Sequence, residues 1–142
     1  MTLNNVTQLS IPLPHSLDTR IHIHLTVKAK AATLFLTSTT QDEPSSTASL
    51  GSFVYALPNR LDPAQPLSTD IYSVESTLEF TTRMAKLLAK RADMPVYVGC
   101  SMNLGGNAMA LSVEEEMVAF RAVVDVVMAR LKGQAAVVNG GP

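Results

Sequence analysis

Histidine is the side chain most often found binding transition metals, and two of the three histidines in this chain are spaced to act together. His22 and His24 are two residues apart in a segment of alternating hydrophobicity, so both point to the same face of a strand. With His15 they offer three nitrogen ligands, a set that can hold a zinc ion. Polar residues on the wet face of an amphipathic strand need no metal, however, and we favour that interpretation. No metal site is therefore expected.

Cys100 is the only cysteine, which excludes a disulfide within the chain. A cysteine acts as a nucleophile where a histidine or a helix N-terminus lowers its pKa. Cys100 instead shares one face of an expected strand with Val96, Val98 and Met102. That apolar setting favours an inert thiol in the core.

Two other segments carry residues with possible chemistry. Gly105 and Gly106 are not followed by the Lys-Ser/Thr or third glycine of a nucleotide-binding loop, and with Asn107 they favour a hairpin turn. The glutamates at 114–116 diverge by about 100° per residue around a helix, so they form no acid and base pair. Their charge instead suits the positive end of a helix dipole. We expect no catalytic residue, no cofactor and no small-molecule substrate.

The composition is unusually apolar, which leaves two interpretations open. Of 142 residues, 46% are hydrophobic and 16% charged, which is more apolar than the surface of a typical monomer requires. Either a partner covers the surplus or a thick sheet core absorbs it, and composition alone does not decide between them. Eleven basic and twelve acidic residues give a formal net charge of -1, so we expect no contact with nucleic acid or with an anionic membrane.

The length fits a single domain, and no segment has the pattern of a targeting sequence or the length of a membrane span. We therefore expect the protein to stay in the cytosol or nucleus. The expected organisation is a partly ordered N-terminal arm at 1–19, one α+β domain at 20–132 and a flexible tail at 133–142.

Alternation of apolar and polar residues predicts most of the strands. The expected strands are 20–28, 31–38, 52–57, 67–72, 96–102 and 108–111. The first four follow one another, which favours an antiparallel meander, and the Gly105-Gly106 turn joins the last two. The arm adds at most a short strand at 8–13, because it contains Pro12 and Pro14.

Two capping boxes predict where helices begin. Ser76 with Glu79 starts a helix that runs to residue 92. Ser112 with Glu115 starts a second helix, which Gly133 ends. These elements predict an α+β fold, with an antiparallel sheet of about six strands and two helices in the order ββββ-α-ββ-α. The second helix has an apolar stripe that steps by three and four residues, formed by Val113, Met117, Phe120, Val124, Val127 and Leu131.

Seven residues are candidates for contact with a partner. Three valines of the last helix fall off its stripe, one phenylalanine shares the outer face of a strand with threonines, and three basic residues edge the first helix. A solvated edge is the simpler interpretation of the basic residues. The candidates are Phe35, Lys86, Lys90, Arg91, Val118, Val123 and Val126.

Four short motifs between residues 66 and 120 occur in an informative order. They are Pro66-Leu67-Ser68-Thr69, Leu87-Leu88-Ala89-Lys90-Arg91, Val96-Tyr97-Val98 and Glu115-Glu116-Met117-Val118-Ala119-Phe120. Taken together, they resemble the proteasome assembly chaperone 4 family in its fungal-type form. The N-terminal half resembles that family only in its pattern of strands.

The resemblance implies a non-catalytic chaperone that forms a heterodimer with its paralogue, proteasome assembly chaperone 3. It also implies that the pair helps α-type subunits of the proteasome core particle to assemble into their ring. The exposed sheet face and the surplus valines would then contact the paralogue, and the polar loops and basic helix edge would contact an α-type subunit. The alternatives are a generic protein-binding adaptor or homodimeric scaffold, and a small enzyme that uses Cys100 or the histidines.

Overall fold

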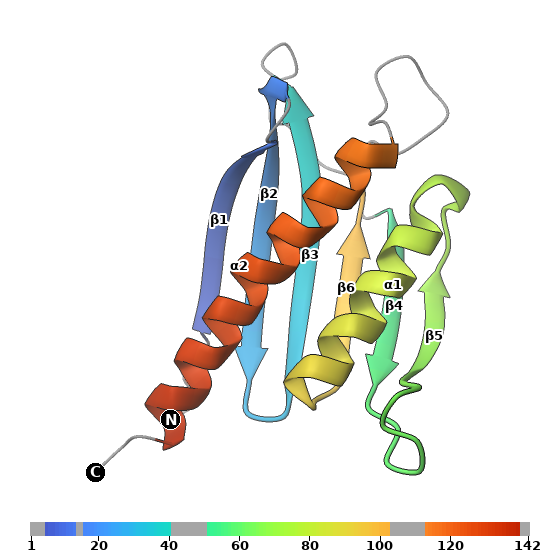
Figure 1. Cartoon of the computed structure of the whole chain (residues 1–142), viewed down its shortest axis with the longest axis vertical. Coiled ribbons are helices and arrows are strands. Elements are labelled where there is room, and N and C mark those ends of the chain that lie inside the picture. The colour runs from blue at the N-terminus through green and yellow to red at the C-terminus, as the bar shows by residue number, and fades with distance from the viewer. Residues whose placement is uncertain (1–4, 14–15, 41–50, 103–112, 140–142) are drawn as a thin grey trace.

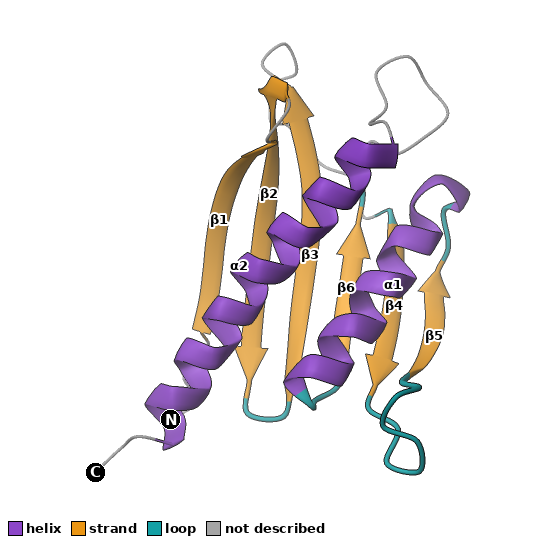
Figure 2. Ribbon diagram, viewed as in Figure 1, coloured by secondary structure: helices purple, strands orange, loops and turns teal. Residues whose placement is uncertain are grey.

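The structure, a computed structural model of the chain, describes residues 5–13, 16–40, 51–102 and 113–139. Within these residues the strands form one sheet, and both helices lie on the same face of it (Figures 1 and 2). This two-layer arrangement is the α+β fold that the sequence predicts. The elements are β1 (Asn5–Leu13), β2 (Ser16–Lys28), β3 (Ala31–Thr40), β4 (Ser52–Leu57), β5 (Leu67–Tyr72), α1 (Glu75–Ala92), β6 (Val96–Cys100) and α2 (Val113–Asn139).

The sheet has the strand order β1-β2-β3-β6-β4-β5 within the described residues. All neighbouring strands are antiparallel except β3 and β6, which are parallel. The predicted meander is therefore wrong at one point, because β6 lies between β3 and β4. β3 ends at Thr40 and β4 begins at Ser52, a separation in sequence longer than the two to five residues of a hairpin loop, so the connection does not require those strands to pair. The apolar β6 takes the central position, where both of its neighbours cover it.

The N-terminal arm contributes a longer strand than the sequence predicts. Residues 5–13 form a full edge strand, which pairs with β2 from Asn5 opposite Val27 to Pro12 opposite Arg20. Proline is tolerated there because an edge strand leaves part of its backbone unpaired. The predicted strand at 108–111 and the Gly105-Gly106 turn lie outside the described residues.

The core lies between the sheet and the two helices. Alternate residues of the strands point toward the helices and are buried, and each such side chain stabilises the fold by roughly 1.5–3 kcal/mol. The largest of the fully buried side chains are Leu13, Ile21, Ile23, Leu25, Leu34, Leu36, Val54, Met84, Leu88, Val96, Val98 and Met102.

Helix α1 begins at Glu75, one residue before Ser76. Ser76 is therefore not the N-cap, and the predicted capping box is wrong. The N-cap is Val74, and its side chain makes no capping hydrogen bond. Ser52 of β4 contributes the polar contacts instead. Its Oγ donates to the backbone O of Val74 (2.9 Å) and accepts hydrogen bonds from the Val74 N–H (2.9 Å) and the Thr77 hydroxyl (2.8 Å). The helix ends at Ala92, and its C-cap Asp93 has a left-handed backbone with φ of 53°.

The buried face of helix α2 is predicted in part, and its end differs from the prediction. Val124, Val127 and Leu131 of the predicted stripe are buried, whereas Val113 and Met117 are 75% and 51% exposed. The buried face also includes the off-stripe residues Ala119 and Val123, and the small Ala119 allows close approach to the core. The helix also continues past Gly133, because one glycine in a helix of this length costs only about 1 kcal/mol. The buried residues of α2 are Ala119, Val123, Val124, Val127 and Leu131.

Candidate protein-binding surfaces

A row of aromatic side chains crosses the face of the sheet that the helices leave open. Phe35 of β3 stacks on Phe53 of β4, with ring centroids 5.8 Å apart and planes inclined by 8°. Phe53 also stacks on Tyr97 of β6 at 5.9 Å, and Tyr97 contacts Tyr55 at 4.6 Å. We call Phe35, Phe53, Tyr55 and Tyr97 the aromatic row. All four are half-buried by one another and keep part of each ring in water.

Strand β5 extends this apolar surface to the edge of the sheet. Tyr72, which is 59% exposed, pairs in register with Phe53, and Leu67, which is 51% exposed, pairs with Leu57. Large apolar side chains gathered on an uncovered sheet face are typical of a site that binds another protein. The uncovered face of the sheet is therefore the first candidate interface.

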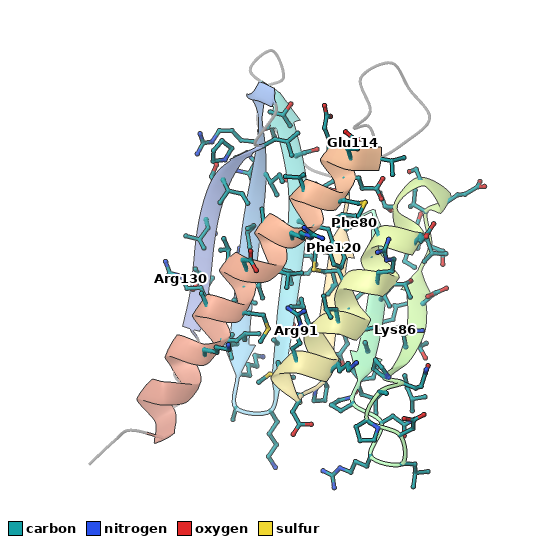
Figure 3. All side chains as sticks on the ribbon, in the orientation of Figure 1. Phe80, Lys86, Arg91, Glu114, Phe120 and Arg130 are labelled. Atoms are coloured by element: carbon teal, nitrogen blue, oxygen red, sulfur yellow. The ribbon has the colours of Figure 1, made fainter. Side chains whose placement is uncertain are left out.

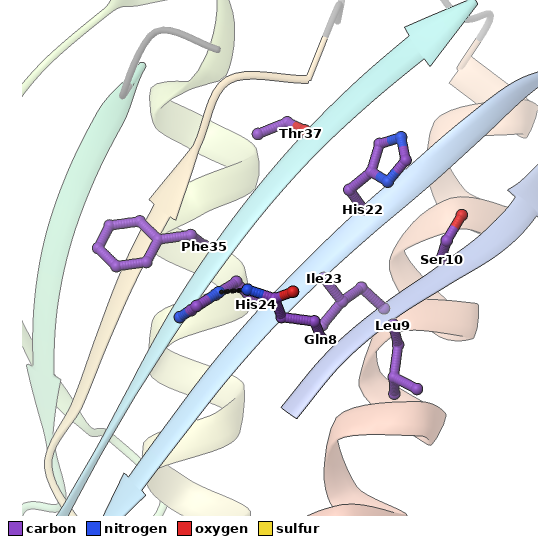
Figure 4. A pocket seen from close by; sticks show the side chains of 8 residues that line it. All are labelled: Gln8, Leu9, Ser10, His22, Ile23, His24, Phe35 and Thr37. Carbon is purple, nitrogen blue, oxygen red and sulfur yellow. Dashed lines mark hydrogen bonds between the residues drawn. The ribbon is translucent and has the colours of Figure 1, made fainter. Parts of the chain in front are cut away.

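The half of the open face formed by β1 and β2 is polar. A shallow groove of about 350 Å³ lies there. Figure 4 shows His22 and His24 on β2, between Gln8 and Ser10 of β1 and Phe35 and Thr37 of β3. Nε2 of Gln8 donates a hydrogen bond to Nδ1 of His24 (3.2 Å). The residues that line the groove are Gln8, Leu9, Ser10, His22, Ile23, His24, Phe35 and Thr37.

The two histidines have protein partners rather than a shared ligand site. Nε2 of His22 is hydrogen-bonded to Oγ1 of Thr39 (2.7 Å), and the His24 ring lies 6.3 Å from that of Phe35. Among the residues that the structure describes, no three His, Cys, Asp or Glu side chains gather as a metal site requires. His15, the third histidine of the sequence argument, lies outside those residues.

Cys100 has the environment of a structural thiol. Its side chain is fully buried. Burial raises the pKa of the thiol from its ordinary 9.0 to about 11, and hydrogen bonds from the backbone of Met102 and the side chain of Thr81 offset only part of that rise. A nucleophilic cysteine needs a lowered pKa and access to substrate, and Cys100 has neither.

The basic candidates lie on the opposite layer of the molecule. Lys86, Lys90 and Arg91 are exposed on the outer side of α1, where Figure 3 labels Lys86 and Arg91. Nearby, the guanidinium of Arg83 lies 5.4 Å from the ring centroid of Phe120, a cation–π contact that joins α1 to α2. Lys86, Lys90 and Arg91 are therefore available for contact with a partner while the open face of the sheet is occupied.

The three valine candidates do not form a surface with Phe35. Val123 is fully buried in the core, which removes it from any surface that the folded chain presents. Val118 and Val126 are half-buried on α2, and Val126 packs against the core. The helix and the open face are on opposite sides of the sheet, so one partner surface cannot include both Phe35 and these valines.

The sequence argument missed most of the aromatic row and one exposed loop residue. Phe53, Tyr55 and Tyr97 alternate with buried residues in their strands, which placed them on an outer face. Only the strand order brings them beside Phe35. Leu61, in the loop between β4 and β5, is 98% exposed. Its neighbouring prolines indicated a turn but gave no sign of that exposure.

Neither helix that the structure describes is long and apolar enough to cross a membrane. A sheet with helices on one face and an uncovered aromatic row on the other is typical of a domain that binds another protein. The chain belongs to the proteasome assembly chaperone 4 family, whose family model matches residues 20–102, more than half of its length. This membership gives the chain a role as a chaperone of proteasome assembly, which is a non-catalytic activity.

A solved structure supports the fold assignment. The chain is similar to one in the crystal structure of a chaperone complex for yeast 20S proteasome assembly, with a TM-score of 0.67 and 17% sequence identity. The similarity covers 91% of this chain and 98% of that chain. At this identity the likeness shows that the two share a fold. Comparison with curated proteins gives no match.

Proposed function

We propose that the chain forms a heterodimer with its paralogue, proteasome assembly chaperone 3, and that the pair promotes assembly of the α-subunit ring of the proteasome core particle. Family membership supports the general role. The observation that supports the pairing is the aromatic row, which lies on an uncovered sheet face. The similar yeast chain comes from a chaperone complex, which is consistent with a partner.

The open face has the chemistry of a lasting interface. Large aromatic side chains bury roughly 150–250 Å² each when covered, and they dominate the energetics of interfaces. A second sheet at the usual spacing of about 10 Å would cover the aromatic row and the neighbouring Leu67 and Tyr72. Because β1 and β2 are polar on this face, the partner's surface is apolar over β3, β6, β4 and β5 and polar over the remainder.

Contact with an α-type subunit is assigned to the other exposed regions, the polar loops and the basic edge of α1. Lys86, Lys90 and Arg91 remain accessible when the sheet face is covered, so the heterodimer can hold both contacts at once. A surface of exposed charges suits a transient contact, whereas the aromatic row suits a permanent one. We place this activity in the cytosol or nucleus, without nucleic acid, membrane or small-molecule substrate.

The pairing is tested by co-expressing the chain with its paralogue and measuring the affinity of the purified pair. We expect a 1:1 complex. Phe53→Ser should weaken it by roughly 30-fold or more, the effect of removing an interfacial hot spot of about 2 kcal/mol. Glu79→Ala, an exposed residue on the helical layer, is the control and should leave the affinity unchanged.

Two results would overturn this proposal. One is a chain that remains a stable monomer or homodimer and ignores the paralogue, which would favour the adaptor or homodimeric scaffold. The other is a Phe53→Ser variant that pairs as tightly as the native chain, which would place the interface elsewhere.

A further inference from the structure

The polar half of the open face adjoins the aromatic row, and Phe35 belongs to both. The Phe35 ring stacks on Phe53 on one side and lies 6.3 Å from the ring of His24 on the other. Phe35 also lines the shallow groove of about 350 Å³. A second sheet that covers the aromatic row therefore also covers this groove, because adjacent strands are only about 4.8 Å apart.

The charged side chains of the polar half have one sign. Alternate residues of β2 are buried against the helices, so Arg20, Lys28 and the two histidines between them face outward. Asp70 is the one carboxylate of the strands whose side chain the structure describes. It pairs with the buried Val54 and therefore lies on the helical side of the sheet. On the open face, the described side chains thus include cations and no carboxylate.

His24 presents a hydrogen-bond donor at the boundary with the aromatic row. Its Nδ1 accepts a hydrogen bond from the Gln8 amide, so the proton of the neutral ring is on Nε2. In the protonated ring both nitrogens carry protons, so Nε2 is a donor in either state. Within the described residues this Nε2 has no hydrogen-bond partner. Figure 4 shows the ring between Gln8 and Phe35.

Arg20 is held beside the same groove. Its Nε donates to Oγ of Ser10 (2.7 Å) and its Nη2 donates to the backbone O of Ser10 (3.2 Å). Ser10 lines the groove. A guanidinium has five N–H donors, so others remain for a partner. Because two hydrogen bonds already position the side chain, an anion that binds Arg20 would cost little side-chain entropy.

We propose that this groove receives a carboxylate side chain from the sheet of the paralogue, an Asp or Glu that accepts the hydrogen bond of His24 and is attracted by the charge of Arg20. The inference rests on the proposed heterodimer and identifies the chemistry of its polar half. Packed sheets lie about 10 Å apart, so side chains of the opposing sheet fill the space above the groove. A carboxylate has only acceptors and the opposite charge, which matches what the groove offers.

A second copy of this chain is a poorer occupant. In a face-to-face dimer of identical sheets, twofold symmetry places the polar half over itself or over the aromatic half of the other copy. The first arrangement brings like charges together. The second covers Arg20 and the histidines with aromatic rings and, among the described side chains of that face, with no carboxylate. The charge of the polar half therefore favours a different partner over self-pairing.

A carboxylate in the groove should make pairing depend on pH. Histidine ordinarily gains its positive charge between pH 8 and 5, whereas Asp and Glu ordinarily stay ionised above about pH 5. The other charged or titratable groups that face His24 are His22, Arg20 and Lys28 on its own strand. From β1 and β3, the described side chains on this face are uncharged. Protonation of the histidines therefore strengthens the attraction, and affinity should increase as the pH falls from 8 to 6.

The test measures the affinity of the purified chain for its paralogue between pH 8 and pH 6. The native pair should bind about 10-fold more tightly at pH 6. His24→Gln keeps an N–H donor but cannot be protonated, so most of this pH response should disappear. His24→Asp places a second carboxylate in the groove and should weaken pairing about 10-fold or more at pH 8. Urea denaturation of each free variant shows whether it is folded.

Lys30→Gln is the control for loss of one positive charge. Lys30 is exposed in the turn between β2 and β3, outside the groove, and its variant should keep the native affinity and the native pH response.

The outcomes separate this inference from the proposed function. A heterodimer with equal affinity at pH 8 and pH 6, or one that tolerates His24→Asp, overturns the carboxylate and leaves the heterodimer intact. A native pH response in His24→Gln also overturns it, because other groups would then titrate. A homodimer of the native chain that His24→Asp disrupts would place a second copy in the groove and overturn it as well. A native chain that does not pair with the paralogue contradicts the proposed function and this inference together.

Discussion

Phe35 and Phe53 stack on each other although their strands are not neighbours. Strand β6 lies between them, and Gly99 is the residue that pairs in register with both. Strands two apart are separated by about 9.6 Å, yet the ring centroids are only 5.8 Å apart. The rings lean toward each other over Gly99, which is buried although it belongs to the open face. The missing side chain of Gly99 therefore makes the stack possible.

The first prediction concerns Gly99→Val. A side chain at this position would separate the Phe35 and Phe53 rings and disrupt the flat surface offered to the paralogue. We expect heterodimer affinity to fall about 10-fold and the free energy of unfolding to fall by roughly 1–3 kcal/mol, because the added side chain displaces the rings packed over a buried position. Titration of the paralogue and urea denaturation measure the two effects. Unchanged affinity would show that the stack is not part of the interface.

A second prediction uses Cys100 as a probe of folding. At neutral pH its thiol is both buried and protonated, so iodoacetamide should modify it only after the chain unfolds. Mass spectrometry of samples with and without urea measures this. Rapid modification of the native protein would revive the alternative of a cysteine-dependent enzyme.

The same group predicts how stability depends on high pH. The folded state holds the thiol proton up to about pH 11, whereas the unfolded chain releases it near 9.0. Unfolding therefore releases a proton between these values, and stability should fall as the pH rises through that window. In Cys100→Ser this contribution should be absent. Urea denaturation midpoints at a series of pH values would reveal the difference, and identical pH profiles would contradict it.

Ser52→Ala tests the polar contacts at the start of α1. The change leaves the backbone groups of Val74 and the hydroxyl of Thr77 without their shared partner in a buried site. We expect a loss of about 1–3 kcal/mol in the free energy of unfolding. Ser73→Ala, on the exposed neighbour of Val74, should change it by less than about 0.5 kcal/mol. Equal effects of the two variants would mean that the contacts of Ser52 contribute nothing.

A further prediction concerns Gly51→Ala, which adds one methyl group at a position with no space for it. Gly51 has φ of 67°, and an added Cβ would clash with the backbone O of Cys100. Because a backbone atom blocks it, the strands must move apart, and we expect a loss above about 3 kcal/mol or failure to fold. Ala29→Gly is the control in the exposed turn between β2 and β3. It increases backbone flexibility, whereas Gly51→Ala reduces it, and it should lower the free energy of unfolding by less than about 1 kcal/mol. A Gly51→Ala chain of native stability would show that this junction adapts freely.

Local patterns predicted the elements better than their arrangement. Strand alternation and helix periodicity identified β2 to β6 and both helices, because those patterns record which side of each element is buried. The position of β6 could not be predicted, since it depends on a parallel pairing with β3, which is distant in sequence. The start of α1 was misplaced because Ser52, 22 residues away, supplies the polar contacts that a local Ser76 was expected to make.

The same limit applies to the candidate protein-binding surface. Local patterns predicted single outward-facing residues, but not which of them lie together. Phe35 was identified because its own strand shows an outer face, but Phe53 and Tyr97 became its neighbours only through the sheet order. Val123 was misjudged because residues of one helix that are three and four apart fit two adjacent arcs. The distribution of valines alone does not tell which arc faces the sheet.

The central place of β6 also bears on how the chain acquires its shape during synthesis. The strands β1 to β3 and the pair β4 and β5 leave the ribosome first, and each group has an open edge where β6 belongs. The two groups can join only after residue 100 has been translated, so the newborn protein passes through a stage with two unsealed sheet edges. Such edges pair readily with foreign strands, and the cell's general folding helpers have most reason to act at this stage.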